Sequence, residues 1–180
     1  MSLTTFDIAL ITASVRSGRI GPSVTSWFAG HLEGYTAFRP DPIDLADPTD
    51  CGTGAAERLG RADAFVFVTP EYNHSFPAPL KEFIDAHHYP WQAKPVAVVS
   101  YGGLSGGVRA TEHLRTVMAE LHAVTLRDSV ALPMVWKNRG ADGSFVAPRP
   151  SESAAKVLLD RLLWWTAALA EARARTPYAA

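Results

Sequence analysis

The sequence predicts an α/β fold in which a five-stranded parallel sheet is covered by helices on both faces. Short apolar segments alternate along the chain with segments whose apolar residues recur at helical spacing. Several of the short segments are apolar on both faces, as in a parallel sheet buried between helices. The length of 180 residues fits one such domain, and we expect a single domain over residues 1–180.

The strands are expected where short apolar runs stand between polar turns. These runs occupy residues 6–11, 35–45, 64–68, 95–99 and 124–132. The second run is the weakest, because Pro40 and Pro42 lack the N–H group that a strand donates.

The helices are expected where apolar residues share one face. In the first of them the stripe consists of Val24, Trp27, Phe28, His31 and Leu32. Similar patterns predict helices around residues 52–61, 80–87, 114–121 and 151–172, and a Gly- and Pro-bearing loop over 138–150.

Composition and charge exclude several classes of protein. The chain has 17 Lys and Arg against 18 Asp and Glu, a net charge of −1, which argues against a nucleic-acid partner. No apolar run is long enough for a membrane span, and the start does not resemble a signal peptide. The single cysteine, Cys51, excludes an intramolecular disulfide, so we expect a cytoplasmic protein.

Ligands of such sheets bind beyond the carboxyl ends of the strands, so we expect the site in the turns there. The turn at 12–22 holds hydroxyl groups, two glycines and two arginines, and it leads into a helix. Ser14, Ser17 and Arg16 beside a helix N-terminus suit a phosphate group. Neither a P-loop nor a GxGxxG fingerprint is present. The alternative is a polar loop with a serine cap.

Two further turns offer groups for a flat ring. The turn at 69–79 is stiffened by proline and carries Tyr72, Asn73 and His74, which suit a heterocycle unless they only cap the next helix. The turn at 100–107 has four glycines, which lets backbone N–H groups approach a ring edge unless the loop is merely flexible. Together the three turns predict a site for a mononucleotide with a flat ring.

These turns carry a resemblance to a known family. The chain resembles the NADPH-dependent FMN reductases over about residues 8–132, through Ser14-Val15-Arg16, Pro70-Glu71-Tyr72-Asn73-His74-Ser75 and Ser100-Tyr101-Gly102-Gly103. The resemblance implies a flavodoxin-like three-layer fold with strand order 2-1-3-4-5. It also implies FMN as the cofactor and NADPH or NADH as the co-substrate.

The resemblance also assigns the residues that contact FMN. The phosphate would be held by Ser14, Arg16, Ser17, Arg19, Ile20 and Gly21. One side of the flavin ring would meet Pro70, Glu71, Tyr72, Asn73 and His74, and the other side Ser100, Tyr101, Gly102 and Gly103.

The activity that the resemblance implies is hydride transfer from NAD(P)H to FMN, followed by electron transfer to a small molecule. The acceptor would be a quinone, an azo compound, a metal oxyanion or free flavin. One alternative is a non-enzymatic electron carrier of the flavodoxin type, against which the charge of −1 argues. Another is a flavin-responsive regulatory protein.

Beyond the cofactor, the sequence predicts little dedicated chemistry. The flavin carries the reaction, so no catalytic side chain is expected, and His74 only lines the pocket. His87 and His88 are adjacent and point in different directions, so no metal is expected. Glu71 is interpreted as a stabilising acceptor, and Arg109 as a residue that pairs across a subunit contact or faces solvent.

The family implies a homodimer or homotetramer. The last helix is compatible with this, because its apolar arc is wider than one sheet face requires. A deeply buried helix would explain the same arc.

Overall fold

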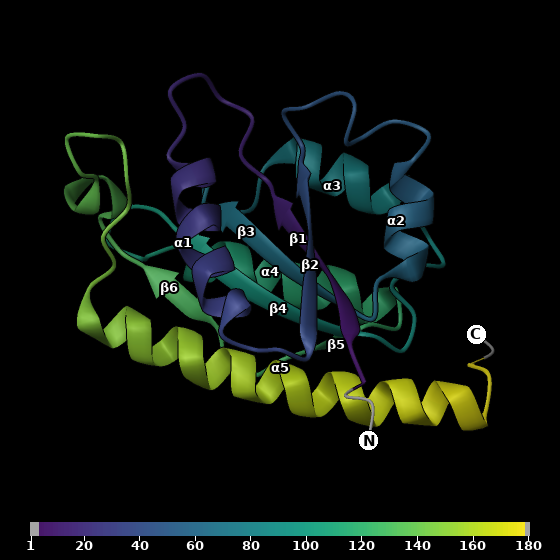
Figure 1. The fold of residues 1–180 in the computed structure, drawn as a ribbon. Helices are drawn as coiled ribbons and strands as arrows, with labels where there is room; N and C mark the ends of the chain where they lie inside the picture. Colours follow the sequence, from purple (N-terminus) through teal and green to yellow (C-terminus); the bar gives the residue numbers. More distant parts are fainter. Residues whose placement is uncertain (1–3, 179–180) are drawn as a thin grey trace.

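The computed structural model describes residues 4–178, and in them a parallel sheet lies between two layers of helices (Figure 1). The elements in chain order are β1 (Phe6–Thr12), α1 (Gly21–Glu33), β2 (Phe38–Asp44), α2 (Ala55–Arg61), β3 (Ala64–Pro70), α3 (Ala78–Asp85), β4 (Pro95–Tyr101), α4 (Val108–Glu120), β5 (Val124–Thr125), β6 (Val130–Leu132), the 3-10 helix η1 (Val135–Asn138) and α5 (Arg149–Arg175).

The strand order is β2-β1-β3-β4-β5, and every pair is parallel, which confirms the expected order. The expected fifth strand is corrected: it is split into β5 and β6, and both pair with β4. Arg115 of α4 donates hydrogen bonds to the carbonyl groups of Leu126 and Arg127 in the intervening segment. These carbonyl groups accept hydrogen bonds from α4, and the pairing with β4 is interrupted between β5 and β6.

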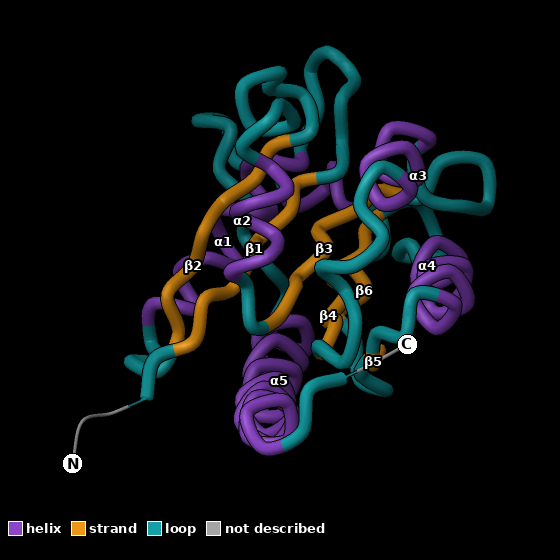
Figure 2. Tube along the Cα trace, turned by 90° about the vertical axis from the view of Figure 1, so that its right-hand side faces the viewer, coloured by secondary structure: helices purple, strands orange, loops and turns teal. Residues whose placement is uncertain are grey.

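Two apolar cores cover the two faces of the sheet. In Figure 2 the strands lie between α5 on one side and α3 and α4 on the other. Residues of β1, β3 and β4 that point to one face pack against α1 and α5, and their neighbours in sequence pack against α2, α3 and α4. This alternation explains why the strands read as apolar on both faces. No helix within residues 4–178 combines the length and apolarity that a membrane span requires.

Helix α5 has 27 residues and is only partly covered. Leu158, Leu159 and Leu162 are buried against the sheet, whereas Val157 and Trp164 remain exposed on the outer side. The expected wide apolar arc therefore has one face in the core and another on the surface of this chain.

The parallel strands bring three loops to one edge of the sheet. We call residues 13–20, after β1, the first loop; residues 71–77, after β3, the second loop; and residues 102–107, after β4, the third loop. Because β1, β3 and β4 are neighbours, the three loops are neighbours as well. The sequence-predicted site residues thus gather at one edge.

Candidate functional site

The first loop presents its backbone N–H groups without internal partners. Within residues 4–178, no backbone N–H from Ser14 to Ile20 donates a hydrogen bond. Helix α1 begins directly afterwards with Gly21 and Pro22, and its own first N–H groups add positive potential. Ser17 and Gly18 are exposed and Ile20 is half-buried. A loop of this kind is suited to bind an anion.

Two buried hydroxyl groups converge on the start of α1. Ser14 is 1% exposed and Tyr101 is 4% exposed, and neither hydroxyl has a hydrogen-bond partner among the described residues. A Cβ atom on Gly21 would lie 2.0 Å from Ser14 Oγ and 2.7 Å from Tyr101 Oη. Unpaired buried hydroxyl groups are costly, so this pair points to a ligand that they contact.

The position of Tyr101 differs from the arrangement that the resemblance implies. Its hydroxyl lies beside Gly21 and the first loop, whereas the resemblance places Tyr101 at the flavin ring. Burial raises the pKa of this phenol well above its ordinary value, so it stays protonated and can donate a hydrogen bond at neutral pH.

Arg16 links the first loop to the second. Its guanidinium carbon lies 3.6 Å from the centroid of the Tyr72 ring, a cation–π contact. Among the described residues Arg16 forms no ion pair, and its side chain is exposed. A cation beside free N–H groups strengthens the attraction for a phosphate.

Arg19, the other arginine of this loop, uses both of its terminal nitrogens within the protein. It donates to both carboxylate oxygens of Asp44, at 2.6 and 2.7 Å, and to the carbonyl of Ser14 at 2.6 Å. The hydrogen bonds from Arg19 to Asp44 raise the pKa of the guanidinium. Arg19 thus joins the first loop to the end of β2.

The second loop contains a tight two-residue turn. The backbones of Tyr72 and Ser75 exchange hydrogen bonds of 2.8 and 3.0 Å, and Asn73 and His74 between them have φ values of 49° and 68°. Two left-handed residues in succession define a type I′ turn, in which asparagine is favoured. The side chains of Asn73 and His74 are exposed at the tip, and Pro70 is buried at the end of β3.

Glu71 braces the second loop against the third. Its side chain accepts hydrogen bonds from Ser105 Oγ at 2.9 Å, Arg109 N at 3.2 Å and Arg109 Nε at 2.7 Å. Burial raises the pKa of Glu71, but the bonds from Ser105 and Arg109 outweigh that effect, and its pKa lies below the ordinary value. Arg109 therefore pairs within its own chain while its side chain remains exposed, in agreement with the expectation that it faces solvent.

The third loop is held by the segment after β6. Gly102 N donates to Leu132 O at 3.3 Å, while Met134 N donates to Gly103 O at 2.9 Å. Ser100 Oγ donates to Gly106 O at 3.1 Å, so this hydroxyl serves the loop itself. The N–H of Gly103 donates no hydrogen bond within residues 4–178, which leaves it available to a ring edge.

Three residues that shape the site were not predicted from the sequence. Asp44 closes β2 beside the first loop, Ser105 contacts Glu71, and Trp136 of η1, 56% exposed, lies against Gly103. Asp44 had a usable signal: an acidic residue at the carboxyl end of the strand next to β1 meets the arginines of the first loop. Ser105 and Trp136 had none, because their contacts depend on tertiary packing.

Comparisons with known proteins show which family the chain is similar to. The family model described as NADPH-dependent FMN reductase matches residues 6–137. The chain is 35% identical over 124 residues to an NAD(P)H-dependent FMN reductase of Schizosaccharomyces pombe, covering 58% of this chain and 62% of that protein. It is 35% identical over 112 residues to a quinone reductase of Escherichia coli, covering 59% of this chain and 56% of that protein. The chain thus spans less than two thirds of the length of either relative.

A solved structure shares the fold. The flavoenzyme NAD(P)H:(acceptor) oxidoreductase FerB from Paracoccus denitrificans superposes with a TM-score of 0.74. The superposition covers 90% of this chain and 97% of FerB at 20% sequence identity. At this identity the likeness concerns the fold alone.

Proposed function

The chain belongs to the NADPH-dependent FMN reductase family, and from this membership we propose that it is an FMN-containing oxidoreductase that uses NAD(P)H to reduce a quinone-type acceptor. Both relatives described above carry such names, one as an FMN reductase and one as a quinone reductase. FMN, when bound, supplies the redox chemistry, and the protein supplies position and electrostatics.

The observation that carries the proposal is the donor set of the first loop. The free N–H groups from Ser14 to Ile20, the two unpaired hydroxyl groups of Ser14 and Tyr101, and the guanidinium of Arg16 are all donors. A phosphate group accepts hydrogen bonds and carries negative charge, so it fits this set and would satisfy the buried hydroxyl groups. We assign the FMN phosphate to it.

The ring of FMN is assigned to the space between the second and third loops. Tyr72 and the exposed tip at Asn73 and His74 line one side, and Gly102 and Gly103 line the other. The free N–H of Gly103 is placed to donate to the ring edge and to favour negative charge there. In this assignment Glu71 and Ser100 hold the loops and do not touch the ring.

The proposal extends to acceptors and assembly. We include azo compounds, metal oxyanions and free flavin among the acceptors, a cytoplasmic location, and a homodimer or homotetramer. The exposed apolar residues Val157 and Trp164 on α5 support an assembly through that helix.

An anaerobic titration tests the activity. The purified protein is loaded with FMN, NADPH or NADH is added, and the visible flavin absorption is followed. We expect the band to bleach and to return when a quinone is added. Protein that takes up no FMN would contradict the flavin site. Bound flavin that neither nucleotide bleaches would favour an electron carrier or a regulatory protein.

A further inference from the structure

We propose that Arg19 is a positioning residue: its ion pair with Asp44 fixes the shape of the first loop, and Arg19 itself does not contact the phosphate. The inference rests on the proposed function, because it concerns the loop to which we assign the FMN phosphate. The two arginines then have different roles: Arg19 positions the loop, and Arg16 is the cation that attracts the phosphate.

Both terminal nitrogens of Arg19 are engaged by acceptors of the protein. Nη1 lies 2.6 Å from Ser14 O and 2.6 Å from Asp44 Oδ1, and Nη2 lies 2.7 Å from Asp44 Oδ2. The bond to Ser14 O joins the end of the first loop to its beginning. The bonds to Asp44 attach that closed loop to β2, which pairs with β1 along its whole length.

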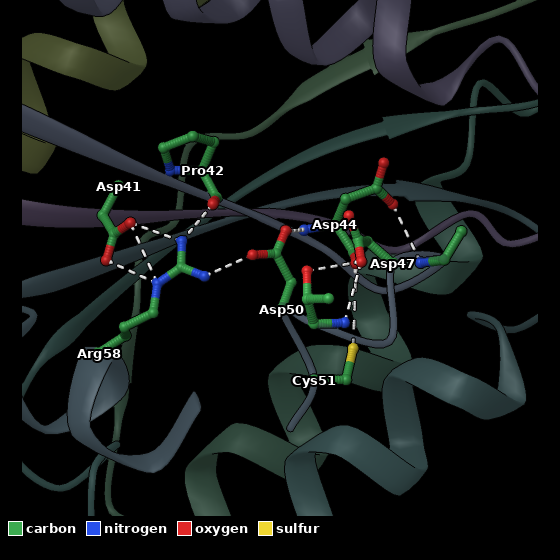
Figure 3. A network of polar contacts seen from close by, with 9 residues as sticks. Asp41, Pro42, Asp44, Asp47, Asp50, Cys51 and Arg58 are labelled. Atoms are coloured by element: carbon green, nitrogen blue, oxygen red, sulfur yellow. Dashed lines mark hydrogen bonds and ion pairs between the residues drawn. The ribbon is translucent and has the colours of Figure 1, made fainter. Parts of the chain in front are cut away.

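Asp44 is held in place by hydrogen bonds that do not involve Arg19 (Figure 3). Its Oδ1 also accepts the N–H of Ala46 at 3.0 Å, and its own N–H donates to Asp50 Oδ2 at 2.9 Å. The other oxygen of Asp50 accepts from Arg58 at 2.6 Å. The carboxylate that receives Arg19 is therefore already fixed, as expected of an anchor rather than a mobile counter-ion.

This network extends to the edge strand of the sheet and lies beside the exposed Cys51. Arg58 donates to Asp41 and to the carbonyl of Pro42, so β2, α2 and the loop between them are joined (Figure 3). The thiol of Cys51 faces Asp44 O at 3.9 Å, and burial together with the neighbouring aspartates raises its pKa. A raised pKa favours the protonated thiol, which is the less nucleophilic form.

The two arginines differ in the net charge that they bring to the first loop. Arg19 and Asp44 cancel, so together they bring no net charge to the first loop, whereas Arg16 has no carboxylate partner within residues 4–178. If Arg19 contacted the phosphate, Asp44 would compete with that phosphate, and removing its charge would strengthen FMN binding. If Arg19 only shapes the loop, removing the charge of Asp44 weakens FMN binding. The two interpretations predict opposite signs.

The experiment measures the affinity of the FMN-free protein for FMN and for riboflavin, which has the same ring without the phosphate. Flavin fluorescence follows both titrations. We expect Asp44→Asn to weaken FMN binding about tenfold, because the bidentate pair is lost, and to change riboflavin binding little. Arg19→Lys is expected to act similarly, because lysine keeps the charge but cannot form the bidentate pair.

A matched control is available at the other end of the same strands. Arg39 of β2 and Asp7 of β1 also form a bidentate pair, far from the first loop along the strands. Asp7→Asn removes a comparable pair and should leave both affinities unchanged. A thermal melt of each variant shows which ones fold. If Asp44→Asn fails to fold, Asp44→Ser, which removes the same charge, takes its place, because the two interpretations predict opposite signs for it as well.

The possible results separate the two claims. Wild-type protein that binds neither flavin overturns the proposed function, and this inference with it. Wild-type protein that binds FMN, together with an Asp44→Asn variant that binds FMN equally or more tightly, overturns the inference alone. Weaker FMN binding with unchanged riboflavin binding supports the positioning role.

Discussion

The first and third loops lie at the same edge of the sheet, but they are held in different ways. The first loop leaves its N–H groups free and is anchored from outside by Arg19 and Asp44. The third loop has most of its polar groups engaged, through Leu132, Met134 and the brace to Glu71. A loop that must bind an anion through its backbone cannot also be stabilised through those N–H groups, so its support comes from side chains.

The largest expected effect comes from a substitution within the third loop. Gly107 has φ of +92°, and a Cβ atom there would lie 2.6 Å from Ser100 Cβ and 2.7 Å from Tyr101 N. Gly107→Ala should therefore lower the free energy of unfolding by about 3 kcal/mol, from backbone strain plus a backbone clash. Urea denaturation of the purified protein measures this loss.

Gly143→Ala is the control for that variant. Gly143 shares a positive φ, +84°, but a Cβ atom there meets nothing within 4 Å. It should cost about 1 kcal/mol, from the strained conformation alone. Equal losses in the two variants would mean that the close packing of the third loop contributes nothing.

The next largest effect is expected when the contacts of Glu71, which join the second and third loops, are weakened. Glu71→Gln should lower the free energy of unfolding by about 2 kcal/mol at neutral pH, because hydrogen bonds to a buried charge are lost. The pKa of Glu71 is lowered on folding, so its contribution is present above the ordinary value of 4.5 and disappears as the pH falls through the lowered pKa. The difference between wild type and variant should shrink in acid.

An exposed pair provides the comparison for this variant. Glu57 pairs with Arg61 at 2.8 Å on the surface of α2, and Glu57→Gln should change stability by less than about 0.5 kcal/mol. A difference between wild type and Glu71→Gln that stays constant down to low pH would show that the charge of Glu71 is not what stabilises the loops.

The smallest expected effect comes from a substitution beside the first loop, and it tests the difference between the first and third loops. Gly21→Ala pushes Ser14 Oγ from its place, because the new Cβ atom would lie 2.0 Å from it. We expect FMN binding to weaken at least about tenfold, the equivalent of about 1.4 kcal/mol. Stability should change less, since the serine hydroxyl can rotate. Equilibrium titration with FMN measures the affinity.

Gly30, in the same helix, serves as the reference. A Cβ atom there meets nothing within 4 Å, so Gly30→Ala should stabilise the helix by about 0.5–1 kcal/mol and leave FMN affinity unchanged. If both variants bound FMN like wild type, the start of α1 would not be the phosphate site.

The pattern of apolar residues predicted most of the fold. The runs at 64–68 and 95–99 became β3 and β4, because strands buried on both faces need apolar residues at every position. The run at 124–132 did not stay whole, since Arg115 of the preceding helix donates hydrogen bonds to carbonyl groups in its middle. A local pattern carries no information about that contact.

The candidate site was predictable in its loops and less so in its side chains. Strand ends locate the loops, but the direction of Tyr101 toward the first loop depends on the space that Gly21 leaves. The two arginines of the first loop look equivalent in sequence. Only the placement of Asp44 beside Arg19 distinguishes them.

The two edges of the sheet have a consequence for aggregation. An unpaired strand edge is a template on which another chain can add a strand, and proteins protect such edges with prolines, charges or short strands. The β2 edge carries Pro40 and Pro42, together with Arg39 and Asp41. At the other edge lie β5 and β6, with two and three residues.

The residues that made β2 look like a poor strand are thus also the ones that limit association through it. Proline offers no N–H to an incoming chain, and the broken edge at β5 and β6 offers no continuous ladder. Replacing Pro40 and Pro42 with valine would give β2 a regular, hydrogen-bonding edge. The sheet is thereby protected against edge-to-edge polymerisation by features that weaken its outer strands.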